Sequence, residues 1–125
     1  MAARARNILV GYDGSEAGRR ALDAAADLVV HGSALSVATV ATGPEDHARK
    51  LLSEARGLLL RRHVTARYLE PVGEPADMLV QTAREVGADL IVLGRRDQTP
   101  LKRLVLGSVS SKVLGAAECD VLVVQ

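Results

Sequence analysis

The chain has 125 residues, enough for one domain with a substantial core and too few for two, so we expect a single domain over residues 1–125. It contains no Phe or Trp, which argues against single-stranded nucleic-acid binding because that relies on exposed aromatic stacking platforms. Its 16 basic and 15 acidic residues give a net charge of +1, which provides no field that favours DNA or an anionic membrane. We therefore expect neither nucleic acid nor a membrane among the partners.

The N-terminal segment and the cysteine content point to a cell compartment. The apolar run behind the basic N-terminus breaks at Gly11 and Asp13, so it does not form a signal peptide. No segment approaches the roughly 20 apolar residues of a membrane span. The single cysteine, Cys119, excludes an internal disulfide and suits a reducing environment. The sequence predicts a cytoplasmic protein.

Short apolar runs alternate with longer amphipathic segments along the chain. Apolar runs predict buried strands at 7–13 and 89–94 and further strands at 34–41 and 120–124, and an alternating run predicts a half-exposed edge strand at 64–70. Helical spacing of apolar residues predicts helices at 14–32, 44–63, 73–87 and 108–117.

Cap residues support the boundaries of two of these helices. Ser15 is suited to cap the first helix and Gly32 to end it, while Pro75 and Gly87 mark the start and end of the third. Strands that are separated by helices must pair in parallel through right-handed crossovers. The sequence therefore predicts an α/β fold: a three-layer sandwich of five parallel strands and four helices.

Two of the predicted strand ends carry residues suited to a ligand, and open α/β sheets bind ligands at such ends. The run Gly11-Tyr12-Asp13-Gly14-Ser15 follows the first strand, and Gly94 follows the fourth. The last helix begins at Gly107 and Ser108, where backbone N–H groups and the helix dipole provide an anion site. Hydroxyls of Ser108 and Ser110 and the cations of Arg95 and Arg96 add to it. The alternatives remain open that Asp13 only shapes a turn, that Gly107-Ser108 only caps a helix, and that the arginines only face solvent.

Three blocks of sequence resemble the universal stress protein family: "ILVGYDGSEAGRRAL", "GEPADMLVQTAREVGADLIVLG" and "LGSVSSKVLGAAECDVLVV". The resemblance implies the strand order 3-2-1-4-5 of the adenine nucleotide alpha hydrolase-like fold, with Asp13 beside Gly94. It also implies a G-x-x-G-x9-G-[ST] motif that binds ATP, running here from Gly94 to Gly107-Ser108. The implied nucleotide-binding residues are Gly11, Tyr12, Asp13, Val40, Leu93, Gly94, Arg95, Arg96, Asp97, Gly107, Ser108, Val109 and Ser110.

The motif departs from the family pattern at two positions. Asp97 takes the place of the second glycine, and Pro100 stands where many members have another. A carboxylate about 4 Å from a phosphate costs roughly 4 kcal/mol at an effective dielectric of 20. A bridging Mg²⁺ reverses that sign, because hard cations accept carboxylate and phosphate oxygens together. We therefore consider ATP or AMP as the ligand, and Mg²⁺ held by Asp97 as a further component.

The sequence supports three hypotheses for the function, given from the most to the least favoured. The first is a regulatory module that binds ATP or AMP between the first and fourth strands. The second is a dimeric stress-response interaction domain that no longer binds nucleotide, for which Asp97 and Pro100 are the evidence. The third is an enzyme, either a slow ATPase or a nucleotidyl-transfer relative. It ranks last because the sequence offers no defined general base or nucleophile and no Walker-type loop.

The remaining polar residues and the last strand complete the sequence predictions. His31, His47 and His63 lie near helix ends without ligand spacing, so we interpret them as surface residues. The final predicted strand has no element after it to cover its edge, and an uncovered apolar edge invites pairing. The family resemblance implies such pairing. We therefore expect a homodimer formed through Val121, Leu122, Val123 and Val124.

Overall fold

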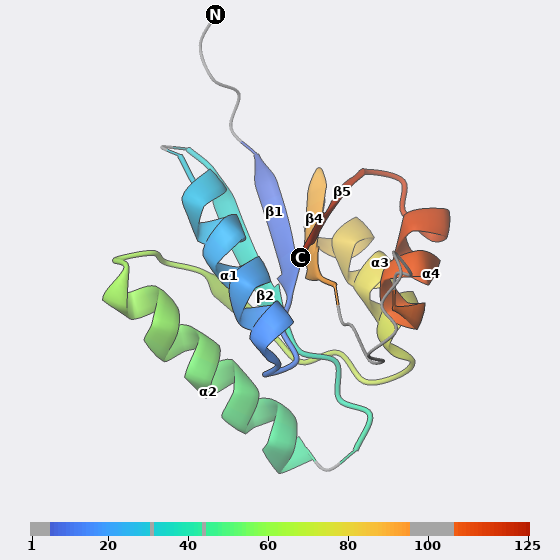
Figure 1. Cartoon of the computed structure of the whole chain (residues 1–125), viewed down its shortest axis with the longest axis horizontal. Helices are drawn as coiled ribbons and strands as arrows, with labels where there is room; N and C mark the ends of the chain where they lie inside the picture. The colour runs from blue at the N-terminus through green and yellow to red at the C-terminus, as the bar shows by residue number, and fades with distance from the viewer. Residues whose placement is uncertain (1–5, 31, 44, 96–106) are drawn as a thin grey trace, which may run out of the picture.

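A computed structural model describes residues 6–30, 32–43, 45–95 and 107–125, and it forms one five-stranded parallel sheet in the order β3-β2-β1-β4-β5 (Figure 1). The strands are β1 (Asn7–Gly11), β2 (Ala34–Ala38), β3 (Arg67–Leu69), β4 (Leu90–Gly94) and β5 (Asp120–Val124). The helices are α1 (Glu16–Leu28), α2 (Glu45–Arg61), α3 (Pro75–Val86) and α4 (Ser108–Ala116). The predicted fold class and strand order are confirmed.

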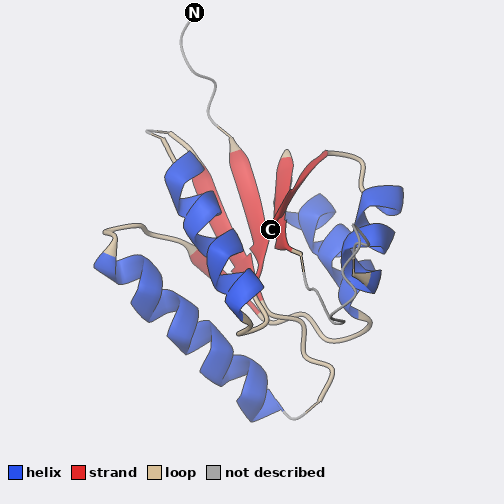
Figure 2. Cartoon of the chain, in the orientation of Figure 1, coloured by secondary structure: helices blue, strands red, loops and turns tan. Residues whose placement is uncertain are grey.

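Helices cover both faces of the sheet, so the core forms two apolar layers (Figure 2). Alternate residues of β1 point to opposite faces: Ile8 and Val10 pack with α1 and α2, whereas Leu9 packs with α3 and α4. All three side chains are fully buried. A parallel sheet covered on both sides requires such unbroken apolar runs, which is why the short runs in the sequence predicted its strands correctly.

The packing of α1 on β4 depends on a glycine. A Cβ added at Gly94 would lie 2.3 Å from the carbonyl oxygen of Ala17 and 3.0 Å from its Cβ. The helix backbone therefore rests directly on the end of the strand, where only glycine leaves space. This contact holds the start of α1 against the carboxyl end of β4.

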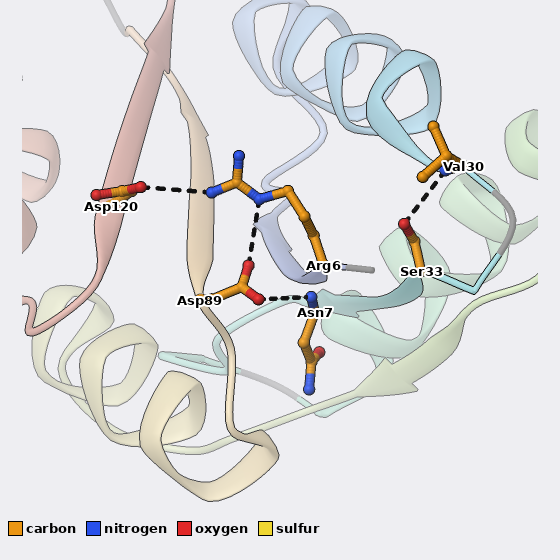
Figure 3. Close-up of polar contacts among 6 residues, drawn as sticks. All are labelled: Arg6, Asn7, Val30, Ser33, Asp89 and Asp120. Carbon is orange, nitrogen blue, oxygen red and sulfur yellow. Dashed lines mark hydrogen bonds and ion pairs between the residues drawn. The ribbon is translucent and has the colours of Figure 1, made fainter. Parts of the chain in front are cut away.

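The predicted end of the first helix at Gly32 is wrong by several residues. Helix α1 ends at Leu28, and Val29 adopts an extended conformation. Ser33 then closes a turn on Val30: its hydroxyl accepts from the Val30 N–H at 3.2 Å, and its own N–H donates to the Val30 carbonyl at 2.8 Å (Figure 3). Gly32 lies inside this turn with φ +93° and does not cap the helix.

The edge strand β3 is shorter than the predicted 64–70. The N–H groups of His63 and Val64 donate to the Leu60 and Leu59 carbonyls, each at 3.0 Å, so these residues complete the end of α2. Only the three residues of β3 pair with β2, opposite Ser36–Ala38. The alternating pattern located the strand correctly. Its predicted start, Val64, instead takes part in the hydrogen bonds that end α2.

At the amino edge of the sheet, one arginine links three strand starts (Figure 3). Arg6 Nε lies 3.3 Å from Asp89 Oδ1, and its Nη2 lies 3.4 Å from Asp120 Oδ2. The other Asp89 oxygen accepts from the Asn7 N–H at 3.1 Å. These groups are largely exposed, so each ion pair contributes about 1 kcal/mol or less. Their role is to align β1, β4 and β5 at the edge where these strands begin.

Candidate functional site

A cleft of about 760 Å³ opens at the carboxyl edge of the sheet, within the size range of small-molecule sites. The cleft lies at the switch point of the sheet. The strand order reverses there, because β1 lies between β2, which is followed by β3, and β4, which is followed by β5. Most of the sequence-predicted residues line it: Gly11, Tyr12, Asp13, Val40, Leu93, Gly94, Gly107, Ser108, Val109 and Ser110. The structure therefore brings together strand ends and a helix start that are up to 99 positions apart in the chain.

One of the predicted residues that the structure describes, Arg95, is not among those that line the cleft. Arg95 is half-buried, and its N–H donates to the Val124 carbonyl at 2.6 Å, which continues the pairing of β4 with β5. Arg96 and Asp97 lie outside the described residues, as does Pro100.

The Tyr12 side chain is buried in the core beside the cleft. It is 2% exposed and packs with the apolar layer under α1 and α2, and its hydroxyl donates to Glu54 on α2. Burial, together with this hydrogen bond, raises the pKa of Tyr12, and the same bond lowers the pKa of Glu54. Tyr12 thus fastens α2 to the end of β1.

Asp13 shapes the turn that starts α1. Its Oδ1 accepts from the Ser15 N–H at 3.0 Å, and it also accepts from the Ser15 hydroxyl. That hydroxyl in turn accepts from the Gly18 N–H at 3.0 Å, which caps the helix as predicted. A Cβ at Gly18 would come within 2.7 Å of Asp13 Oδ1, so glycine keeps this turn compact. The turn holds the Asp13 carboxylate at the rim of the cleft.

The segment after β2 forms a wall that the sequence did not single out, apart from Val40. Thr39 is 3% exposed, and its hydroxyl donates to the Tyr12 carbonyl at 2.8 Å, which joins the ends of β1 and β2. Val40 packs partly against the apolar layer under α3 and α4 and also faces the cleft. Ala41 pairs with the segment after β3, accepting and donating backbone hydrogen bonds there. Thr42 then continues the wall toward α2.

The first turns of α2 close this side of the cleft. His47, Ala48 and Leu51 line it, and His47 is exposed. The sequence interpretation of His47 as a surface residue is correct for its exposure but missed its position at the cleft. The available signal was the short connection from β2 to α2, which leaves the helix start close to the strand end.

The start of α4 differs from the starts of α1 and α3 in how its amides are satisfied. Ser15 caps α1, and a Glu74 carboxylate oxygen caps α3 by accepting from the Asp77 N–H at 2.9 Å. That bond is the main reason why the pKa of Glu74 is lowered. At α4 the capping residue is Gly107, and no side chain of the described residues accepts from the first turn. The amides of this turn therefore lack an acceptor in the described part of the chain, at the edge of the cleft.

The described residues contain neither a cluster of metal ligands nor a membrane-spanning helix. In residues 6–30, 32–43, 45–95 and 107–125, no group of three or more His, Cys, Asp or Glu side chains is placed to hold a metal ion. No helix in those ranges has the length and apolarity to cross a bilayer.

An open parallel sheet with a cleft at its switch point defines a doubly wound α/β protein. The chain belongs to the universal stress protein family, whose model matches residues 4–125. The universal stress protein YxiE of Bacillus subtilis is 35% identical over 144 aligned residues, covering 94% of this chain and 97% of that protein.

Two solved structures of the family carry nucleotides and share the fold. A universal stress protein in complex with cAMP is 31% identical, with a TM-score of 0.79 over 98% of each chain. The universal stress protein from Archaeoglobus fulgidus in complex with dAMP is 26% identical, with a TM-score of 0.75 over 96% of this chain and 98% of that one.

Proposed function

We propose that this protein is a cytoplasmic regulatory module that binds an adenine nucleotide in the cleft between the ends of β1 and β4. One observation carries the proposal: the first turn of α4, without a side-chain cap among the described residues, faces a cleft of nucleotide size at the switch point. Related proteins of the same fold bind cAMP and dAMP, which are both adenine nucleotides.

The start of α4 supplies the phosphate site in this proposal. Hydrogen bonds to a charged group contribute about 1.5–3 kcal/mol each, and the helix dipole adds about 0.3–1 kcal/mol for an anion. Ser108 and Ser110 line the cleft at this point and bring hydroxyl donors. A phosphate there satisfies the amides that Gly107 leaves without a side-chain acceptor, so occupancy and helix capping reinforce each other.

The rest of the nucleotide extends along the sheet edge. From the α4 start, a bound molecule passes the end of β1, where the Asp13 carboxylate is a hydrogen-bond acceptor suited to ribose hydroxyls. Beyond it, Val40 provides an apolar surface at the end of β2 for the base. Asp13 then has two roles: it accepts the hydrogen bonds of the turn that starts α1, and it accepts from the ribose.

Isothermal titration calorimetry with AMP on wild type, Gly107→Val and Gly115→Val tests the proposal. Valine at Gly107 places a branched side chain over the first-turn amides, and we expect it to remove AMP binding. Gly115 lies near the other end of α4, where an added Cβ meets nothing within 4 Å, so the same substitution is a matched control that keeps affinity. Unchanged AMP affinity in Gly107→Val would exclude the α4 start as the phosphate site.

Mass spectrometry of small molecules that are released when the purified protein is gently denatured would identify the nucleotide. We expect an adenine nucleotide in about stoichiometric amount from wild type and none from Gly107→Val. Release of a different class of metabolite from both proteins would contradict the proposal.

We further propose that the protein is a homodimer that pairs through β5. Within the described chain β4 is the strand that pairs with β5, so the outer backbone edge of β5 is open, and Leu122 on it is 39% exposed. Antiparallel pairing of Val121 to Val124 with the same strand of a second copy satisfies these backbone groups under two-fold symmetry. This edge lies on the far side of β4 from the proposed base position, so dimerisation leaves the cleft open.

A further inference from the structure

We propose that His47 recognises the nucleobase of the bound nucleotide. This inference rests on the nucleotide binding proposed above and assigns a base contact to a residue that the sequence analysis placed on the general surface. It follows from the position of α2 relative to α4 along the sheet edge, from the exposure of His47, and from the bonding of its neighbours.

Strand order determines which part of a ligand reaches His47. Helix α4 begins after β4 and α2 begins after β2, and β1 lies between these two strands (Figure 1). Two strand spacings, about 10 Å, therefore separate the ends of β2 and β4. A nucleotide with its phosphate at the α4 start has its ribose near β1 and reaches the α2 side with its base.

His47 is placed and available for that contact. It lines the cleft from the first turn of α2 and is exposed. No hydrogen bond or ion pair joins the His47 side chain to another residue in the described part of the chain. The neighbouring cleft residues on this side, Ala48 and Leu51, are apolar. The imidazole is thus the group on this wall that offers both a flat ring for stacking and an N–H donor for a ring nitrogen of the base.

The packing and hydrogen bonds of α2 fix the position of the helix that carries His47. Ala48 and Ala55 are buried, with exposed fractions of 3% and 0%, so α2 lies close to the sheet. Glu54 accepts a hydrogen bond from the Tyr12 hydroxyl, and its Oε1 lies 3.4 Å from Arg19 Nη2, which links α2 to the end of β1 and the start of α1. A base that packs against His47 therefore meets a wall that is already in place.

The test compares ligands with and without a base. Calorimetry is run with AMP and with ribose 5-phosphate on wild type, His47→Ala and His63→Asn, with ribose 5-phosphate also measured by competition against AMP. Base stacking on a ring contributes about 1–3 kcal/mol, so we expect His47→Ala to weaken AMP binding about tenfold and to leave ribose 5-phosphate unchanged. His63 lies just beyond the other end of α2, and asparagine suits its φ of +58°, so His63→Asn is the matched control and keeps wild-type affinity.

The outcomes separate this inference from the proposed function. If wild type binds AMP and His47→Ala binds it equally well, His47 does not contact the base and the inference is wrong. An equal loss for AMP and ribose 5-phosphate also overturns it, because it places His47 on the phosphoribosyl group. If wild type binds neither ligand, the proposed function itself fails.

An NMR measurement on the intact wild-type protein gives a second, independent readout. We expect the ring C–H signals of His47 to shift on AMP addition through the ring current of the base, while those of His63 stay in place. Ribose 5-phosphate at the same occupancy should leave the His47 signals unshifted. Equal shifts with both ligands would assign the effect to the sugar phosphate and overturn the base contact.

Discussion

Replacing Gly94 by alanine tests whether this motif glycine is needed for packing, independently of any nucleotide. The added methyl carbon would lie 2.3 Å from the Ala17 carbonyl oxygen, where ordinary contact begins at 3.4 Å. The obstacle is helix backbone, so no side-chain rotation relieves it, and α1 must move away from β4. Ala21 and Leu22 of α1 are almost completely buried against the sheet, so that movement opens the core.

The expected cost follows from these contacts. Overpacking of a well-packed core costs about 1–3 kcal/mol, and contact with backbone places this site at the upper end. The smaller conformational freedom of alanine in the unfolded chain offsets about 0.4–1 kcal/mol. We therefore expect a net loss of about 2 kcal/mol in the free energy of unfolding. With a urea dependence of about 1.5 kcal/mol per M, the unfolding midpoint falls by about 1.3 M.

Urea unfolding followed by far-ultraviolet circular dichroism, without nucleotide, measures this loss. Gly57→Ala is the matched control: Gly57 lies within α2, an added Cβ there meets nothing within 4 Å, and alanine raises stability by about 0.5–1 kcal/mol. The two Gly→Ala changes should shift the midpoint in opposite directions. A Gly94→Ala midpoint within 0.3 M of wild type (about 0.5 kcal/mol) would refute the close approach of α1 to β4.

Three further predictions concern the metal, the dimer and pH. Asp97 should make ATP binding depend on Mg²⁺, and Asp97→Gly should raise affinity measured in EDTA; equal wild-type affinity with and without EDTA would contradict this. Val123→Pro removes a donor from the β5 edge and should yield monomer or insoluble protein, whereas light scattering of a monomeric wild type at micromolar concentration would exclude the dimer. The pKa of Tyr12 is raised in the folded state, so the unfolded chain loses this proton first and stability falls as pH rises above the ordinary tyrosine value of about 10. Tyr12→Phe should flatten the decline of the urea midpoint between pH 9 and 11, and an unchanged slope would assign the decline to other groups, Tyr68 among them.

Local sequence patterns were sufficient for the elements but not for the order of the strands. The apolar runs of β1 and β4 fit a sheet that is covered on both faces, and the periodicity of α1 and α3 follows their buried sides. Which strand lies beside which is a matter of long-range packing, and it was expected only from the family resemblance. Errors occurred at helix ends, where backbone hydrogen bonds compete: Gly32 lies in a turn, and Val64 belongs to the end of α2.

The candidate site was partly predictable for the same reason. Residues next to strand ends and at the start of α4 were found because parallel sheets direct those ends to one edge. Thr39 and His47 were missed because only the neighbouring positions of β1 and β2 bring them to the cleft. The direction of the Tyr12 side chain had a usable signal: it stands two positions after Val10, and residues two apart in an extended chain share a face.

The glycines at the two ends of the motif, Gly94 and Gly107, have different physical explanations, and this matters for judging nucleotide binding. Gly94 is required by the contact between α1 and β4, so a chain that had lost its ligand would still need it. Gly107 leaves the first turn of α4 without a side-chain acceptor among the described residues, so water or an anion has to accept from these amides. A serine or aspartate there would cap α4 with only a few tenths of a kcal/mol of added stability, and its side chain would fill the place of a phosphate. The glycine at 107, more than the one at 94, is therefore the feature of this chain that favours a binding module over an interaction domain without nucleotide, because it leaves the phosphate position open.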